Sequence, residues 1–155
     1  MSRISTHLQL FLVTISVFNS KSKKNNKSVL NIFIIMTDLI KKQYLSHLKC
    51  LVAFALSEAS ISQKEAEVIM TIKNRIGLSD EDLNLCIKHP ETIDDIIPES
   101  QSTKIEFFKD WVKLIISEEK TDSYDQSFCP VIALKLGLDK QVAELIFKET
   151  ITEET

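Results

Sequence analysis

Two histidine–cysteine pairs are the first residues in the chain whose types and spacing could do chemistry. His47 and Cys50 stand three positions apart, as do Cys86 and His89, so each pair would lie on one face of a helix. Together they would supply the two thiolates and two imidazoles of a tetrahedral zinc site. Packing is the simpler interpretation, because His47 and Cys86 have apolar counterparts in a second, similar stretch of the chain. We therefore interpret these pairs as packing residues.

No catalytic motif is present in the sequence. It contains no glycine-rich phosphate loop, no Gly-x-Ser-x-Gly elbow, and no histidine beside a plausible cysteine partner. Phe107, Phe108 and Trp111 could line a ligand pocket, but aromatic residues at helical spacing more often form a core. The sequence thus predicts a protein that is not an enzyme.

The composition favours a helical domain. The chain has 155 residues, of which 44% are hydrophobic and 26% charged, as in ordinary globular proteins. Two glycines and three prolines are too few for the frequent turns of a sheet protein. The three cysteines lack close spacing, which fits free thiols in a reducing cytoplasm better than a disulfide framework. We expect an all-α, cytoplasmic protein.

Charge and hydropathy separate residues 1–35 from the rest. This leader carries five basic residues and no acidic one, so the remainder carries a formal −8. An acidic globular part argues against nucleic acid as a partner, because phosphate contacts need clustered Lys and Arg. The apolar run Leu8–Phe18 is shorter than the ~20 residues of a membrane-spanning helix.

Three interpretations of the leader follow. In the first, Met36 is the true start, and residues 1–35 are non-native upstream sequence, disordered or forming a short extra helix. In the second, they are a secretory signal or membrane anchor, and in the third a structured extension. A membrane partner is expected only if residues 1–35 are expressed, since basic residues beside an apolar run can contact anionic lipid.

Apolar residues at helical spacing, bounded by capping residues, predict six helices. Their expected limits are Asp38–Leu56, Ser62–Gly77, Ser79–Pro90, Ser100 or Ser102 to Ile116, Asp122 or Ser123 to Gly137, and Asp139–Lys148. Ser62 and Glu65 form a capping-box signature, and Gly77 supplies a left-handed C-terminal residue. Pro130 should kink the fifth helix or delay its start. The residues expected in the core of the two shortest helices are Leu83, Cys86, Ile87, Val142, Leu145 and Ile146.

The chain contains one stretch twice. Residues 48–88 and 108–148 align without a gap at an offset of 60 residues, and the two glycines, Gly77 and Gly137, are equivalent. Each copy holds one long helix and two shorter ones, none of which covers its own apolar stripe. The repeat predicts an all-α, pseudo-symmetric bundle of about six helices, built from two three-helix repeats.

Two stretches of the first copy resemble the TerB-like family associated with tellurite resistance. They are Leu51–Glu65, which contains Ser57-Glu58-Ala59, and Arg75–Ser79, which contains Ile76-Gly77-Leu78. The family shows an apolar helix running into an Ala-Asp-Gly turn, an Ile, a Glu that opens the next helix, and a closing Leu-Gly-Leu. Here the Ala-Asp-Gly turn is replaced by Ser57-Glu58-Ala59 and, in the second copy, by Ser117-Glu118-Glu119.

The resemblance covers Met36 to about Thr150. It implies an all-helical internal duplication and a bacterial, mainly cytoplasmic module linked to metal or chemical stress. Such modules bind metal or other proteins, and the resemblance implies no catalytic activity.

Four acidic residues correspond in position to the family's acidic sites. They are Glu58 and Glu65, with Glu118 and Asp125 as their counterparts in the second copy. Clustered carboxylates suit a divalent cation such as Ca²⁺, Mg²⁺ or Mn²⁺. In the simpler interpretation, Glu65 and Asp125 only cap helices and the turn acids are solvated.

The sequence as a whole predicts a TerB-like domain, residues 36–155, behind the leader 1–35. We expect a non-enzymatic cytoplasmic module for stress response or tellurite resistance, with a protein partner and a divalent cation at the acidic inter-helix turns. Two alternatives remain: a protein-interaction adaptor that binds no metal, and a membrane-associated protein if the apolar leader is genuine.

Overall fold

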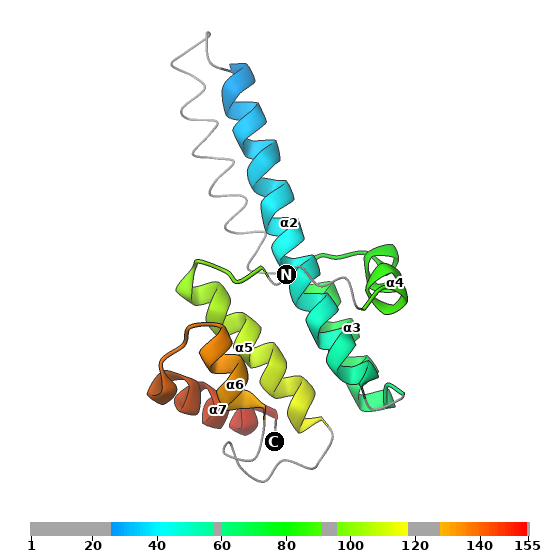
Figure 1. The fold of residues 1–155 in the computed structure, drawn as a ribbon, viewed down its shortest axis with the longest axis vertical. Helices are drawn as coiled ribbons and strands as arrows, with labels where there is room; N and C mark the ends of the chain where they lie inside the picture. Colours follow the sequence, from blue (N-terminus) through cyan, green and yellow to red (C-terminus); the bar gives the residue numbers. More distant parts are fainter. Residues whose placement is uncertain (1–25, 58–59, 91–95, 118–127, 155) are drawn as a thin grey trace. The chain divides into compact units, whose positions relative to one another are not determined.

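The computed structural model describes residues 26–57, 60–90, 96–117 and 128–154. Within these ranges the chain forms six helices and no strand, which confirms the predicted all-α class (Figure 1). The helices are α2 Asn26–Leu56, α3 Gln63–Ile76, α4 Asp80–Lys88, α5 Gln101–Ile116, α6 Cys129–Lys135 and α7 Lys140–Glu154.

The chain divides into two compact units, residues 1–44 and residues 45–155. Among its described residues the first unit holds only the N-terminal part of α2, and the second holds the rest of α2 and the other five helices. The division falls after Tyr44, whereas the charge pattern placed one before Met36. None of the helices in the described ranges is both long and apolar enough to cross a lipid bilayer.

Helix α2 begins earlier than expected. It starts at Asn26, so the expected start at Asp38 is wrong, while the expected end at Leu56 is confirmed. No glycine or proline occurs between residues 26 and 56, and the second apolar run of the leader, Val29–Ile35, contains nothing that breaks a helix. The second of the leader's two apolar runs therefore belongs to α2, and residues 1–25 lie outside the described part.

The caps of α3 and α4 follow the sequence signals. The Ser62 hydroxyl accepts the N–H of Glu65 at 3.2 Å, and the Glu65 carboxylate accepts the N–H of Ser62 at 2.7 Å. Ser79 and Asp82 form a second box of the same kind at the start of α4. Each box satisfies two backbone groups that the first turn of a helix leaves without partners, and the predicted capping of both helices is confirmed.

Both glycines end a helix with the same geometry. Gly77 has φ 75° and Gly137 has φ 68°, in the left-handed region. The N–H of Gly77 reaches the carbonyl of Asn74, and that of Leu78 reaches Lys73; the N–H of Gly137 and of Leu138 make the matching bonds to Leu134 and Ala133. This pair of bonds is the Schellman arrangement, and it turns the chain sharply toward the next helix.

Helix α6 is short and begins at Cys129. Pro130 lies in its first turn, where a missing N–H costs no hydrogen bond, so the predicted late start is confirmed. The predicted caps Asp122 and Ser123 lie outside the described residues. Ser100 occupies the N-cap of α5, although its side chain makes no capping hydrogen bond there.

Two residues expected in the core are on the surface instead. Ile87 on α4 is 41% exposed and Leu145 on α7 is 61% exposed. In α7 the buried residues are Ala143, Ile146, Phe147 and Thr150, so the inward face is rotated away from Leu145. The helix also continues to Glu154, beyond the expected end at Lys148. A short apolar pattern does not define the angular position of the buried face well.

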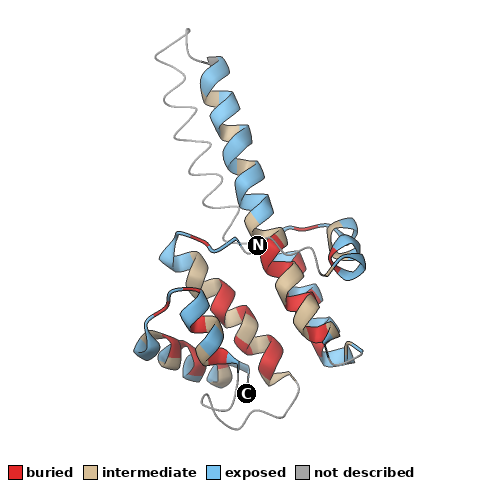
Figure 2. Cartoon of the chain, viewed as in Figure 1, coloured by how far each residue is buried: buried red, intermediate tan, exposed pale blue. Residues whose placement is uncertain are grey.

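Helix α5 is the centre of the second unit. It packs against α3, α6 and α7, and Phe54 of α2 meets its Trp111 edge to face, with ring centroids 5.3 Å apart. Phe108, Val112 and Leu114 of α5 have no exposed surface. In Figure 2 the buried residues of the unit accordingly concentrate on α5 and the facing side of α2.

Replacing either glycine by alanine should destabilise the protein by roughly 1–2 kcal/mol, because a Cβ disfavours the left-handed backbone. The cost should be similar at both positions. An added Cβ meets nothing within 4 Å at Gly77 and only Lys104 Nζ, at 3.6 Å, at Gly137. Urea unfolding measures the change, and Gly77→Asn should lose less because asparagine tolerates this conformation. Losses below about 0.5 kcal/mol at both sites would contradict the assignment.

Candidate functional site

A buried carboxylate joins three helices of the second unit. Asp110 on α5 is 1% exposed, and its Oδ2 accepts hydrogen bonds from His47 Nε2 on α2, at 2.8 Å, and from Arg75 Nη2 on α3, at 2.5 Å. An ionised carboxylate only accepts, so Nε2 of His47 carries the proton. We call these three side chains the Asp110 cluster. Arg75 is its outer member, with 40% of its side chain exposed.

Both the flat face and the Nε2 edge of the His47 imidazole make contacts with α5. The rings of His47 and Phe107 are stacked, with centroids 3.8 Å apart and an interplanar angle of 4°. His47 is buried, and its Nε2 edge meets Asp110. Contacts from α5 therefore determine both the plane and the edge orientation of the ring.

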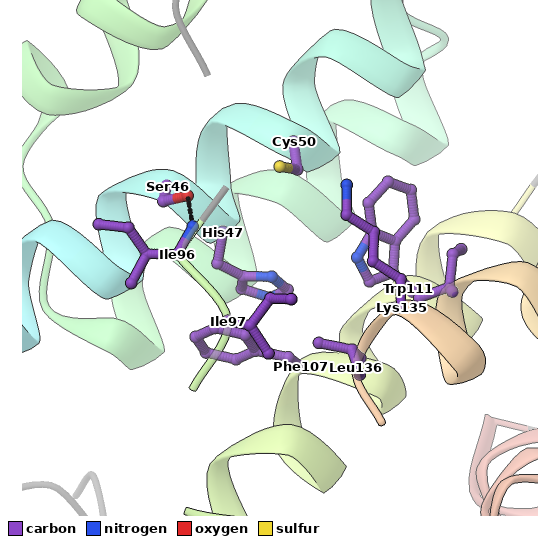
Figure 3. A pocket seen from close by; sticks show the side chains of 10 residues that line it. Ser46, His47, Cys50, Ile96, Ile97, Phe107, Trp111, Lys135 and Leu136 are labelled. Atoms are coloured by element: carbon purple, nitrogen blue, oxygen red, sulfur yellow. Dashed lines mark hydrogen bonds between the residues drawn. The ribbon is translucent and has the colours of Figure 1, made fainter. Parts of the chain in front are cut away.

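A small pocket lies beside His47. It has a volume of about 60 Å³, well above the roughly 10–15 Å³ that one water molecule requires. Most of its walls are apolar, and Figure 3 shows the Lys135 side chain running past the Trp111 ring toward α2, where Cys50 lies. The lining residues are Ser46, His47, Cys50, Ile96, Ile97, Phe107, Trp111, Ile132, Lys135 and Leu136.

A hydrogen bond from a backbone N–H to a side-chain hydroxyl ties the rim of the pocket to α2. The N–H of Ile96 donates to the Ser46 hydroxyl at 3.2 Å, as the dashed line in Figure 3 marks. Pro98 is buried, whereas Ile96 and Ile97 are 40% and 47% exposed. The segment before α5 thus presents two branched apolar side chains at an opening whose inner wall is aromatic.

Comparisons with protein-family models, with curated proteins and with solved structures find no match to this chain. The TerB-like resemblance therefore stays a proposal, carried by the residues quoted for it. We therefore infer function from the geometry of the described residues.

The two histidine–cysteine pairs do not assemble into a metal site in the described part of the chain. No group of three or more His, Cys, Asp and Glu side chains suited to a metal ion occurs there. Cys50 lines the pocket, whereas Cys86 is fully buried and His89 is exposed. Burial raises the pKa of the Cys86 thiol to about 11, against smaller opposing effects that include nearby Lys49. Cys86 is thus a protonated packing residue.

Of the four predicted cation ligands, one lies in the described residues. Glu65 is 2% exposed, and its carboxylate accepts the Ser62 N–H in the capping box. Glu58, Glu118 and Asp125 fall outside the described part. The capping role of Glu65 is confirmed, and a cation at the acidic turns stays a prediction.

Neither Asp110 nor Arg75 was predicted from the sequence as a site residue. Asp110 follows Phe107 by three positions and precedes Leu114 by four, so it lies on the apolar face of α5. A lone acid on such a face is a usable signal, because a buried carboxylate needs partners. Its partners lie 63 and 35 positions away in the chain, and no local pattern identifies them.

Asp110→Asn should lower the free energy of unfolding by about 2 kcal/mol, since two hydrogen bonds to a buried charge are weakened. Arg75→Gln should cost about 1 kcal/mol or less, because its side chain is partly solvated. Lys113→Gln is the matched control on α5: its exposed ion pair with Glu154, at 3.1 Å, should contribute less than about 0.5 kcal/mol. Chemical denaturation gives all three values, and an Asp110→Asn loss no larger than the control would contradict the role of the cluster.

Two substitutions at Glu65 separate capping from cation binding. Glu65→Gln keeps a side chain that completes a capping box, and should retain most of the stability in EDTA, whereas Glu65→Ala should lose about 1 kcal/mol or more. The measurement is a thermal melt in EDTA and then in Ca²⁺, Mn²⁺ or Mg²⁺, where a cation at ~100 Kd adds about 2.7 kcal/mol. A stabilisation by cation that Glu65→Gln abolishes would establish the predicted site; no stabilisation would leave Glu65 as a cap alone.

Proposed function

We propose that residues 36–155 form a non-enzymatic TerB-like interaction module whose pocket beside His47 receives an apolar side chain of a protein partner. The pocket itself carries this proposal: it is small and mostly apolar, and it is lined by the exposed Ile96 and Ile97 and by the ring of Trp111. The link to stress response or tellurite resistance in the cytoplasm comes from the resemblance alone.

Helix boundaries support the proposed repeat. α2 ends at Leu56 and α5 at Ile116, 60 residues later, and α4 begins at Asp80 while α7 begins at Lys140, again 60 residues later. The Schellman turns at Gly77 and Gly137 have the same spacing. Two three-helix repeats would account for each of these coincidences.

The same offset relates the Asp110 cluster to the pocket. It pairs Phe107 with His47 and Cys50 with Asp110, and it pairs Arg75 with Lys135. His47, Arg75 and Asp110 form the buried cluster, whereas Phe107, Cys50 and Lys135 all line the pocket. In a duplicated fold the pocket is therefore the counterpart of the Asp110 cluster. The thiol of Cys50 in the first repeat then corresponds to the carboxylate of Asp110 in the second.

His47 has a structural role in this proposal. Its Nε2 proton is directed to Asp110, and its ring is stacked on Phe107. We assign the cluster to holding α2, α3 and α5 together beneath the partner's binding pocket.

The pocket also suggests the chemistry of the partner. An aliphatic side chain fits the apolar walls, and the ammonium group of Lys135 favours a carboxylate beside that side chain. We therefore infer a short peptide segment with a branched or unbranched aliphatic residue next to Asp or Glu. A divalent cation at Glu58, Glu65, Glu118 and Asp125 remains a separate proposal.

Selection of a phage-displayed peptide library on the full chain tests this function. We expect enriched peptides to carry an aliphatic residue beside an acidic one, and to change the fluorescence of Trp111, the only tryptophan of the chain. Ile97→Asp should weaken the selected peptide by 10-fold or more, because burying an aliphatic side chain is worth about 1.5–3 kcal/mol.

Ile87→Asp provides the matched control. Ile87 is exposed to a similar extent, 41% against 47%, but does not line the pocket. Its substitution should leave peptide affinity unchanged. Equal effects of the two variants, or selected peptides whose binding leaves Trp111 fluorescence unaltered, would contradict docking in this pocket.

A further inference from the structure

The N-terminal part of α2, residues 26–44, exposes an unusual amount of apolar surface. Figure 2 shows this segment as almost wholly exposed or half-buried. Seven large apolar side chains along it are between 39% and 58% exposed. They are Leu30, Ile32, Ile34, Ile35, Met36, Leu39 and Ile40. A contiguous set of this kind on one helix points to an interaction surface rather than to isolated exposed residues.

Four polar residues of the segment lie on one side of the helix. Lys27, Asn31, Asp38 and Lys42 recur at intervals of four, seven and four, which places them on a single face. Val29, Phe33, Met36 and Ile40 recur at helical spacing on the opposite face, and Ile32 and Leu39 widen it, whereas Leu30, Ile34 and Ile35 lie closer to the polar side. The segment is thus amphipathic, with a broad apolar face.

The charge of the segment is basic. Its described residues carry Lys27, Lys41 and Lys42, all exposed, against the single acid Asp38. Over residues 1–44 the sequence has seven basic residues and one acidic residue, a formal +6, which leaves −9 for residues 45–155. Two copies of such a segment repel each other, whereas a negatively charged surface attracts it.

The length of the apolar part fits a helix that lies in a membrane surface. Val29–Ile40 covers 12 residues, or ~18 Å of helix, well short of the ~30 Å hydrocarbon core. Lysines stand at both ends, at positions 27, 41 and 42. An amphipathic helix of this type buries its apolar face at the boundary between headgroups and acyl chains, and its lysines reach anionic headgroups.

We propose that residues 26–44 bind the surface of an anionic lipid bilayer, with the face Val29–Phe33–Met36–Ile40 inserted and the three lysines at the headgroups. The amphipathic face and the basic charge carry this proposal together, independently of the pocket in the second unit. A lipid surface matches both properties, whereas a second copy of the segment matches only the first.

Flotation of the full chain with vesicles tests the proposal. We expect binding to vesicles of phosphatidylcholine and phosphatidylserine, little binding to phosphatidylcholine alone, and loss of binding at high salt. Replacing Lys27, Lys41 and Lys42 by glutamine should weaken binding on the order of 100-fold, since each lysine near an anionic surface contributes about a factor of five. The matched control replaces three exposed lysines of the second unit, Lys64, Lys88 and Lys148, by glutamine, and should bind as the unaltered chain does.

A second variant, Ile32→Asn with Met36→Asn and Ile40→Asn, tests insertion. It should also reduce flotation, while circular dichroism shows that the helices of the second unit remain. Absence of flotation with anionic vesicles would overturn the proposal, as would equal effects of the two sets of lysine substitutions. A dimer in size-exclusion chromatography that the asparagine variant dissociates, without flotation of the unaltered chain, would assign this face to a second copy instead.

Discussion

The second unit depends on a carboxylate that is removed from water. Asp110 projects from α5 into the space between α2 and α3, where the imidazole of His47 and the guanidinium of Arg75 both bind one of its oxygens. An acid in this place is costly unless both contacts form, so the helices that carry the partners must dock in one register. The stacking of His47 on Phe107 restricts the docking register of α2 and α5 further, because two flat rings in contact tolerate little sliding.

The apolar core and the polar cluster make different contributions to the fold. Residues such as Leu48, Leu51 and Phe108 supply buried area, which favours close packing but accepts several arrangements. The hydrogen bonds of Asp110 select among these arrangements. The pocket lies directly beside the Asp110 cluster. His47 belongs to both, and Phe107, which stacks on His47, lines the pocket. A binding site formed on such a support is pre-organised, which reduces the entropy lost when a partner docks.

Local signals in the sequence predicted local structure well. Ser62, Glu65, Gly77 and Ser79 each act within a few residues, and the structure places every one of them in its expected cap or turn. The exposure of Leu145 was not predicted, because helix propensity does not reveal what packs on a helix. The early start of α2 was missed although nothing between residues 26 and 37 breaks a helix. The Asp110 cluster and the pocket depend on contacts between distant parts of the chain. From one sequence, the residues of the site could be recognised as unusual, but their partners could not be assigned.

The two Schellman turns, which we call corners, also limit where residues can be inserted or deleted in the chain. Between α3 and α4, Gly77 ends one helix and Ser79 caps the next, with the buried Leu78 between them. Gly137 and Leu138 do the same between α6 and α7. One residue inserted at either corner would lengthen the turn. If it joined the following helix, it would rotate the residues behind it by ~100° and carry Cys86 or Ala143 out of the core. Insertions and deletions in homologous chains are therefore expected elsewhere, and these two corners should keep a constant length.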